Sequence, residues 1–360
     1  MKQRLILCIA VFTVMALSNA IVPVLPLFAS GAAMQGLLYS AYFVGALCTV
    51  LPGGILCERF GRVPLIRWGL LLSLVSGALM ILVPGQRVLA GARLLEGVGA
   101  GLFISAAMAW VNSQPDHEPL SGRFMASLNA GLIAGLVITG LIPEHYTYNT
   151  IPGSFILFTL MMAIVLLMSA VIREVEYPLS PKEPITGALI SHWWMYVSAF
   201  LLIGATGAVT ALYPEFTGRS ADLLGVQIAL QNIATIVAVL VASRFRLDPI
   251  PTIRVGSVVL GLSVLLCYLT PAGFAVMGAA AGVVIIAQMA FLAETGSGQG
   301  ITMGLYNSAT YAGMAILPAI SGALFQYLGS VAAFLVIAGL VGVVTVTIGW
   351  CSACSLKRLF

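Results

Sequence analysis

The sequence predicts an all-α polytopic membrane protein with twelve transmembrane helices in two pseudo-symmetric six-helix bundles. Of its 360 residues, 60% are hydrophobic and only 8% are charged, and the mean hydropathy is +1.07. A soluble domain carries roughly 25% charged residues, so this composition cannot cover a surface exposed to water. A series of apolar stretches of about 20 residues, each the length of a transmembrane helix, indicates that the bilayer is the solvent of this chain.

Twelve apolar stretches are long enough to cross a hydrocarbon core of roughly 30 Å as helices. The clearest of them, 154–172, contains no charged residue. The N-terminal stretch resembles a secretory signal, but its apolar region is longer and many similar segments follow, so we interpret it as the first span. In chain order, the predicted spans are 5–28, 35–57, 65–84, 87–111, 122–143, 153–172, 192–213, 221–243, 254–270, 273–293, 300–326 and 329–352.

The distribution of Lys and Arg predicts the orientation of these spans, because cytoplasmic loops carry an excess of both residues. With the N-terminus inside and twelve crossings, thirteen of the sixteen basic residues fall on the cytoplasmic side, whereas only Arg87 and Arg219 fall outside. An odd number of crossings would scramble this pattern in the second half. We therefore expect a multi-pass protein of the plasma (cell inner) membrane with both termini in the cytoplasm.

A polar interval in mid-chain predicts the division into two bundles. Residues 173–187 carry three prolines and charges of both signs, as in a linker. We expect an N-terminal bundle over 1–173, a cytoplasmic linker over 174–190 and a C-terminal bundle over 191–360. An offset of 178 residues aligns Asn129 with Asn307 at matching places in the two halves, as in transporters built from parallel repeats.

A charged turn between the second and third spans carries the resemblance to a known family. The segment 53–62, GGILCERFGR, is similar to the signature G-x-L-x-D-R-x-G-R of the major facilitator superfamily, with Glu58 in place of the usual Asp. The resemblance covers the whole chain and implies a secondary transporter. In that family the turn acts as a conformational latch that ties the two halves together on the cytoplasmic side. The resemblance assigns this latch to Gly54, Glu58, Arg59, Gly61 and Arg62.

Two ionisable residues lie inside the fourth span. Arg93 and Glu96 belong to ARLLEGVGAGLF, which resembles the family pattern R-x-x-x-G-x-G, and their i,i+3 spacing places them on one helix face. An ionisable residue within a membrane span is a functional hypothesis by default. Two alternatives remain open. Either the two charges neutralise each other and help pack the bundle, or they face the central cavity and Glu96 carries the coupling proton.

Further polar residues within the spans are candidates for lining a substrate cavity. Each of them also fits a second interpretation, a hydrogen bond between helices. These candidates are Asn19, Tyr42, Asn129, Gln231, Asn307 and Tyr311.

The sequence favours a transporter over an enzyme, because it shows no Ser/His/Asp set, no metal-ligand cluster and no phosphate-binding loop. We therefore expect no cofactor, no metal and no nucleic-acid partner. The amides, aromatics and few charges of the spans favour proton-coupled efflux of an amphipathic or lipophilic compound by a monomer. The alternative is an importer of a small carboxylate or sugar, with Arg93 pairing to the anion. A non-transporting membrane scaffold or receptor is a more remote alternative.

Overall fold

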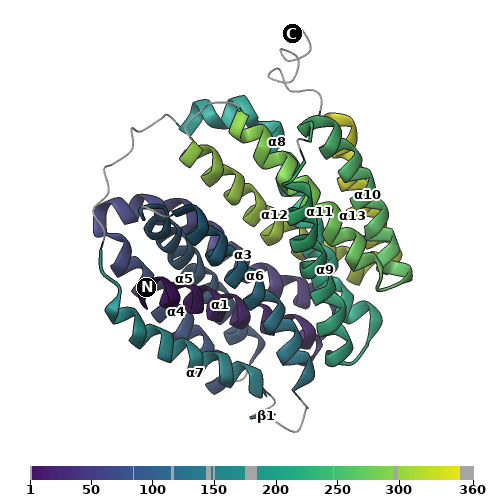
Figure 1. Ribbon diagram of the computed structural model, residues 1–360. Coiled ribbons are helices and arrows are strands. Elements are labelled where there is room, and N and C mark those ends of the chain that lie inside the picture. The colour runs from purple at the N-terminus through teal and green to yellow at the C-terminus, as the bar shows by residue number, and fades with distance from the viewer. Residues whose placement is uncertain are drawn as a thin grey trace. The chain divides into compact units, whose positions relative to one another are not determined.

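The computed structural model describes residues 2–83, 85–114, 117–142, 147–148, 151–174, 185–245, 247–294 and 299–348. In this part of the chain, twelve helices are long and apolar enough to span a membrane. The predicted fold class and the predicted number of spans are therefore confirmed, and long helices make up nearly all of what the structure describes (Figure 1).

The first half of the chain supplies six of the spans. Its helices are α1 (Lys2–Ala20), η1 (Val22–Val24), α2 (Leu25–Phe28), α3 (Ala32–Phe60), α4 (Arg62–Leu82), α5 (Gln86–Asn112), α6 (His117–Leu141), α7 (Gly153–Met168) and η2 (Ser169–Val171). The short strands β1 (Thr147–Tyr148) and β2 (Ile151–Pro152) pair antiparallel between α6 and α7. The first membrane span, Lys2–Phe28, consists of α1, η1 and α2.

The second half supplies the other six spans. Its helices are α8 (Ile185–Thr217), α9 (Ala221–Ala242), α10 (Pro249–Leu269), α11 (Gly273–Glu294), α12 (Gln299–Leu328) and α13 (Ser330–Thr347). A backbone kink at His192 interrupts α8, and the apolar span begins at that residue. The two spans that the sequence separates by only three residues are distinct helices, because α10 ends at Leu269 and α11 begins at Gly273.

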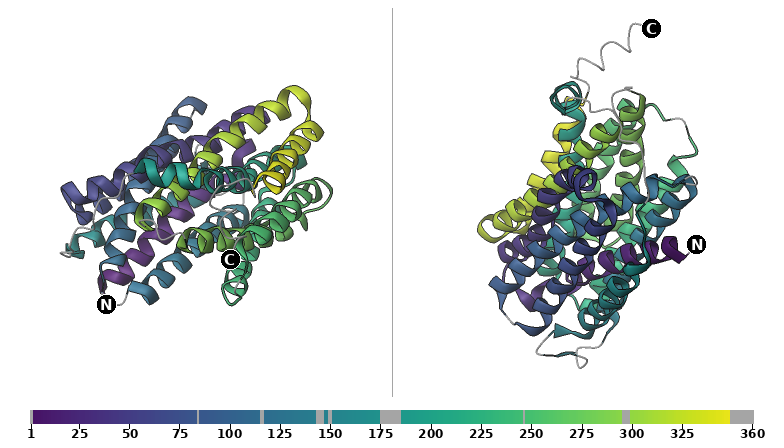
Figure 2. Two further views of the ribbon diagram at one scale, coloured as in Figure 1. Left: turned by 90° about the horizontal axis from the view of Figure 1, so that it is seen from above. Right: turned by 90° about the vertical axis from the view of Figure 1, so that its left-hand side faces the viewer.

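The chain divides into two compact units. Unit 1 comprises Met1–Gly31, Leu37–Ser180 and Thr217–Ala229, and unit 2 comprises Ala32–Gly36, Pro181–Phe216 and Leu230–Phe360. The boundaries predicted from the sequence, 1–173 and 191–360, stay a prediction, and most of the predicted linker 174–190 lies outside the described residues. Each unit consists of long helices packed side by side (Figure 2).

Within unit 1, α1 packs on α6, and α4 packs on both α5 and α7. The contact between α4 and α5 is close because two glycines face each other. A Cβ added to Gly69 would lie 2.6 Å from the carbonyl oxygen of Gly99, and a Cβ added to Gly99 would lie 2.7 Å from that of Gly69. Small residues let two helix backbones approach in a membrane, where packing replaces the hydrophobic effect as the force between helices.

The charged turn between α3 and α4 is tighter than the sequence indicates. Glu58, Arg59 and Phe60 continue α3, and Gly61 alone separates α3 from α4. Gly61 has φ +86°, a backbone conformation that glycine adopts without the steric penalty of a Cβ. The change of direction between the two helices therefore depends on a single glycine.

Candidate functional site

An ion pair lies in the first half of α5. Arg93 and Glu96 are about 10 and 15 Å along this helix from Gln86, at 1.5 Å per residue. The guanidinium Nη1 of Arg93 donates a hydrogen bond to Oε2 of Glu96 at 2.6 Å. The two side chains are 1% and 0% exposed, so this pair is enclosed within unit 1.

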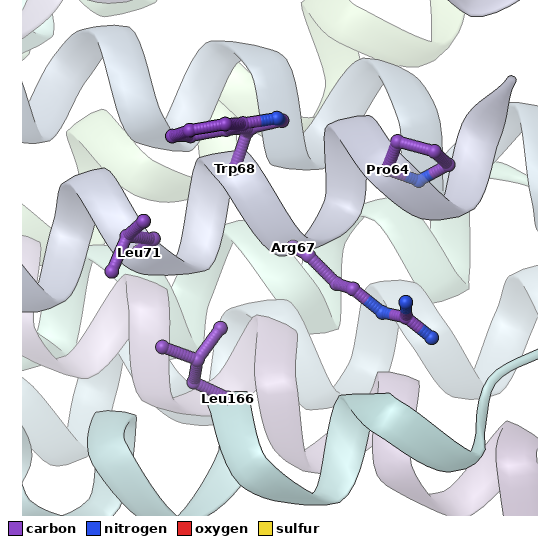
Figure 3. Close-up of a pocket in the computed structure, with 5 residues that line it drawn as sticks. All are labelled: Pro64, Arg67, Trp68, Leu71 and Leu166. Atoms are coloured by element: carbon purple, nitrogen blue, oxygen red, sulfur yellow. The ribbon is translucent and has the colours of Figure 1, made fainter. Parts of the chain in front are cut away.

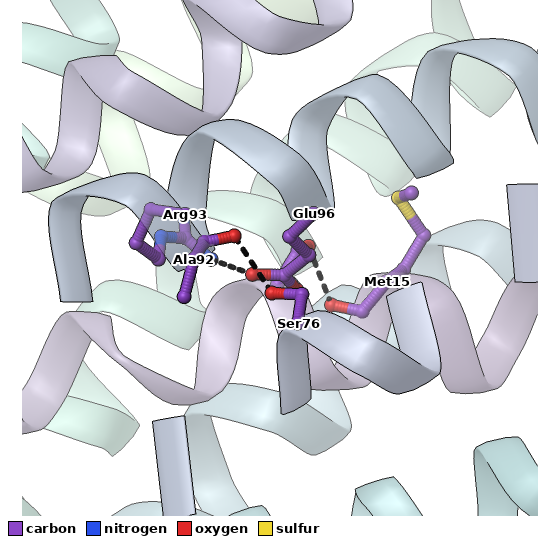
Figure 4. A network of polar contacts seen from close by, with 6 residues as sticks. Met15, Ser76, Ala92, Arg93 and Glu96 are labelled. Carbon is purple, nitrogen blue, oxygen red and sulfur yellow. Dashed lines mark hydrogen bonds and ion pairs between the residues drawn. The ribbon is translucent and has the colours of Figure 1, made fainter. Parts of the chain in front are cut away.

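Neighbouring helices enclose the pair on several sides. The guanidinium carbon of Arg93 lies 4.8 Å from the centre of the Tyr42 ring of α3, within the range of a cation–π contact. Gly97 makes this contact possible, because its missing side chain leaves room for the carbonyl of Tyr42 against α5. Ser76 of α4 donates to the carbonyl of Ala92 at 2.7 Å, one residue before Arg93, as Figure 4 shows.

Two polar atoms of the pair lack hydrogen-bond partners. Among the described residues, nothing accepts from Nε of Arg93 and nothing donates to Oε1 of Glu96, although both atoms are buried. A buried polar atom without a partner costs about 1–3 kcal/mol. Oε1 of Glu96 is therefore an oxygen that can take a proton without displacing a bond from another protein group.

The residues assigned to the conformational latch lie in the last turns of α3 and at its junction with α4. Gly54 is exposed, and the exposed guanidinium of Arg59 lies 5.4 Å from the ring centre of its neighbour Phe60. The side chain of Glu58 lies outside what the structure describes. Arg62 is half-buried as the first residue of α4.

Glu174 caps the start of α4, next to this junction. Its Oε1 accepts from the backbone N–H of Arg62 at 3.0 Å, and its Oε2 accepts from that of Val63 at 2.9 Å. A carboxylate at a helix N-terminus satisfies free N–H groups and complements the helix dipole. A Cβ on Gly61 would lie 3.2 Å from Oε2 of Glu174, so glycine also leaves room for the cap.

The segment that carries Glu174 is held by two other helices. Nη2 of Arg67, on α4, donates to the carbonyls of three residues within 169–172, at distances between 3.2 and 3.4 Å. The indole N–H of Trp110, on α5, donates to the carbonyl of Arg173 at 2.9 Å. These bonds fix the backbone immediately before Glu174 and so position its carboxylate.

The other predicted cavity residues are spread over both units. In unit 1, Asn19 is half-buried and donates to the carbonyl of Leu132 at 3.2 Å, a bond between α1 and α6. The amide of Asn129 donates within its own helix. In unit 2, Oε1 of Gln231 accepts from Thr210 at 3.2 Å, whereas Asn307 is exposed and Tyr311 is half-buried on α12.

Of the predicted cavity residues in unit 1, the structure thus brings together Arg93, Glu96 and Tyr42, and it places Asn19 and Asn129 in separate contacts. The role of each candidate as a cavity residue stays a prediction. For Arg93 and Glu96, the structure shows the ion pair that the first of the two sequence-based alternatives requires.

Sequence reasoning missed a buried polar network in unit 2. Gln288 of α11 donates to Ser198 of α8 at 2.9 Å and accepts from the hydroxyl of Tyr306 of α12 at 3.0 Å. All three side chains are buried. The available signal was a glutamine within an apolar span, but its partners lie 90 and 18 residues away.

A second missed contact involves an acidic residue in the last turn of α8. Within unit 2, the amide Nε2 of Gln35 donates to Oε2 of Glu215 at 2.5 Å. Glu215 lies inside the apolar span His192–Thr217. The predicted span 192–213 ends two residues before Glu215, so the sequence placed this carboxylate in a loop.

Comparisons with known proteins agree with this architecture. The model of the Major Facilitator Superfamily matches residues 7–219. The chain is 29% identical over 230 residues to the multi-drug resistance efflux pump PmrA of Streptococcus pneumoniae, covering 57% of this chain and 56% of PmrA. It is 26% identical over 175 residues to the quinolone resistance protein NorA of Staphylococcus aureus, covering 46% and 45%. The alignments thus span about half the length of these relatives.

A solved structure resembles the whole fold. The crystal structure of the nucleoside transporter NupG (D323A mutant) superposes with a TM-score of 0.76, covering 97% of this chain and 100% of NupG. The two sequences are only 13% identical, so this likeness concerns the fold alone.

Proposed function

Because this chain belongs to the major facilitator superfamily, whose members are membrane transporters and not enzymes, we propose that it is a secondary active transporter that exports an amphipathic or lipophilic compound in exchange for protons by alternating access. PmrA and NorA, which resemble it in sequence, are named for drug efflux and drug resistance. These names support export as the proposed direction of transport, and at 29% and 26% identity the direction stays a proposal for the present chain.

The buried ion pair of α5 is the observation that carries the proton-coupled part of this proposal. Glu96 is fully buried about 15 Å along a membrane-spanning helix, with one oxygen bound to Arg93 and the other without a partner among the described residues. Protonation at Oε1 would neutralise Glu96 and release Arg93 from its partner. The Tyr42 ring, 4.8 Å away, would still face the guanidinium. The pair would thus have two arrangements that differ by one proton.

Uptake of a permanent cation into proteoliposomes that contain the protein tests this function. The charge of ethidium does not change with pH, so a pH gradient alone does not drive it across a lipid membrane. We expect ethidium to accumulate on the acidic side of vesicles that contain the protein, and an uncoupler to abolish the accumulation. Glu96→Gln, which mimics the protonated carboxyl, should lose the dependence on the gradient, while Asp248→Asn at the exposed start of α10 should keep it.

Two results would contradict the proposal. If Glu96→Gln still concentrated ethidium as a function of the pH gradient, Glu96 would not be the coupling group. If vesicles instead accumulated a small carboxylate or sugar together with protons, the protein would be an importer.

We further propose that Gly54, Glu58, Arg59, Gly61 and Arg62 act as the conformational latch of this transporter. The Glu174 cap supports this role, because it holds the start of α4 in a defined position next to Arg62. Glu58→Gln should insert and fold normally but transport more slowly than the wild type. Transport at the wild-type rate would contradict the assignment.

The predicted topology completes the proposal. We propose that the protein is a monomer in the plasma membrane, with both termini and the linker 174–190 in the cytoplasm. Single cysteines introduced at residue 2, in the linker and at residue 358, in a variant without native cysteines, should be protected from membrane-impermeant maleimide in intact cells. Labelling of any of these positions from outside would contradict this topology.

A further inference from the structure

A hollow of about 270 Å³ opens on the surface of unit 1 between α4 and α7. It is lined by Pro64, Arg67, Trp68 and Leu71 of α4 and by Leu166 of α7 (Figure 3). The four residues of α4 follow the spacing i, i+3, i+4 and i+7, which places them along one side of the helix. The hollow thus combines a cation and an indole at one end with two leucines further along.

The position of the hollow along α4 matches the interface of a membrane. Arg67 lies about 7.5 Å and Leu71 about 13.5 Å from Arg62 along the helix axis. Arginine near the end of a membrane helix extends toward the headgroups, and tryptophan is enriched at the same level. Trp68 is 60% exposed, whereas the two leucines are half-buried. The distribution of basic residues predicts that this end of α4 is cytoplasmic.

Arg67 has hydrogen-bond donors left for a ligand. A guanidinium carries five N–H groups, and the bonds to the carbonyls within 169–172 all come from Nη2. Among the described residues, neither Nη1 nor Nε of Arg67 donates to a protein acceptor. Charge-assisted hydrogen bonds from a guanidinium to phosphate are strong, and the N–H groups of Nη1 can supply them.

The charges nearby favour an anion. Arg62 begins the same helix, and Arg173 follows the carbonyls that Arg67 binds. Among the side chains that the structure describes at the start of α4, the acidic one is Glu174, and both of its oxygens already accept from the backbone there. The exposed leucines of α7 continue the apolar surface, with Leu160 60% and Leu167 76% exposed.

We propose that this hollow is a binding site for an anionic phospholipid, with the phosphate on Arg67 and one acyl chain over Leu71 and Leu166. The bound lipid would lie against the backbone segment that positions Glu174, and so beside the start of α4. This inference is independent of the direction of transport and of the transported solute.

The second half of the chain provides a matched control position. Arg254 is the sixth residue of α10, as Arg67 is of α4, and both helices have 21 residues. The two helices share the pattern P-x-I-R-x-G, from Pro64 and from Pro251. Arg254 is exposed, and Val255 occupies the place of Trp68. Arg254 therefore tests whether an arginine at this position of a helix is by itself enough to bind an anionic phospholipid.

Native mass spectrometry of the purified full-length protein tests the proposal. The protein is mixed with equal amounts of phosphatidylglycerol and phosphatidylcholine that have the same acyl chains. We expect the wild type to retain phosphatidylglycerol preferentially, and Arg67→Ala to bind it about fivefold more weakly, the equivalent of the roughly 1 kcal/mol that one basic residue contributes at an anionic membrane surface. Phosphatidylcholine binding should not change, and Arg254→Ala should behave as the wild type.

A second variant separates lipid binding from folding, because Arg67→Ala also removes the bonds to the carbonyls after α7. Leu166→Trp fills the hollow and keeps Arg67, and it should abolish the preference for phosphatidylglycerol. Leu160→Trp places the same side chain at an exposed position of the same helix and should retain the preference.

Three results of the lipid measurement would overturn the proposal. The first is equal retention of the two lipids by the wild type. The second is an equal loss in Arg67→Ala and Arg254→Ala. The third is retention by Leu166→Trp to the same extent as by Leu160→Trp. A protein dimer that Leu166→Trp dissociates would also overturn it, because the hollow would then hold a second copy of the chain.

Discussion

The ion pair of α5 allows its two charges to be removed one at a time. Glu96→Met leaves the guanidinium of Arg93 buried without an anion, and Arg93→Met leaves the carboxylate of Glu96 buried without a cation. Because the side chains are 1% and 0% exposed, neither remaining charge reaches water. Breaking a buried pair by removing one partner costs about 3–5 kcal/mol.

The double variant Arg93→Met/Glu96→Met should be more stable than the sum of the single changes indicates. It leaves no buried charge, and replacing a buried ion pair by apolar groups of similar volume is often neutral or even stabilising. If each single change costs at least about 3 kcal/mol and the double change costs no more than one of them, the coupling energy is at least about 3 kcal/mol. That value is large because the two atoms, Nη1 and Oε2, lie 2.6 Å apart away from solvent.

Thermal unfolding in detergent, followed by tryptophan fluorescence, measures the four proteins of this cycle. Each single variant should unfold on the order of 10 °C below the wild type, and the double variant should recover at least part of that loss. Single variants that unfold at the wild-type temperature, or a double variant as unstable as the sum of both, would refute the view that these residues form one buried pair.

Three further changes test the packing of α4 on α5, the Glu174 cap and the polar network of unit 2. Gly99→Ala places a Cβ 2.7 Å from the carbonyl oxygen of Gly69 and should lower the unfolding free energy by about 1–3 kcal/mol, whereas Gly91→Ala on the same helix meets open space and should be neutral or slightly stabilising in the same thermal assay. Glu174→Ala removes two bonds to the start of α4 and should cost about 1 kcal/mol, whereas Asp248→Ala, at the start of α10, removes no capping bond; equal unfolding temperatures for these two variants would contradict the role of Glu174. Gln288→Leu deprives the buried hydroxyl of Tyr306 of its acceptor and should cost about 1–3 kcal/mol, while Gln227→Leu removes an amide oxygen that lacks a partner among the described residues, so a larger loss in Gln227→Leu would argue against the network.

The fold could be predicted from the sequence because hydropathy is a local property. Each span needs its own run of about 20 apolar residues, and the run from 154 to 172, for example, appears as α7 and η2 over Gly153–Val171. The ends of the helices were less predictable. The charges of Glu58 and Arg59 favoured a loop between the two spans. Both residues instead continue α3, because Gly61 alone supplies the change of direction.

The candidate site was predictable only where its residues lie on one helix. The i,i+3 spacing of Arg93 and Glu96 predicted that both side chains share a face, and the structure pairs them. Tyr42 was a candidate cavity residue only because it is a polar residue within a span, and nothing in the sequence indicated that its ring faces Arg93. Glu174 caps a helix that begins 112 residues earlier, a contact that only tertiary packing determines.

The central claim is that Glu96 carries the proton that is exchanged for the exported compound. If so, binding of the compound and protonation of Glu96 exclude each other. Substrate-induced proton release, measured with a pH indicator in weakly buffered detergent solution, tests it most directly, with ethidium as the substrate. At a pH low enough to protonate Glu96, the account predicts release of up to one proton per bound ethidium by the wild type, because a single carboxyl titrates, and none by Glu96→Gln even though this variant still binds ethidium. Equal proton release by the two proteins would contradict the claim.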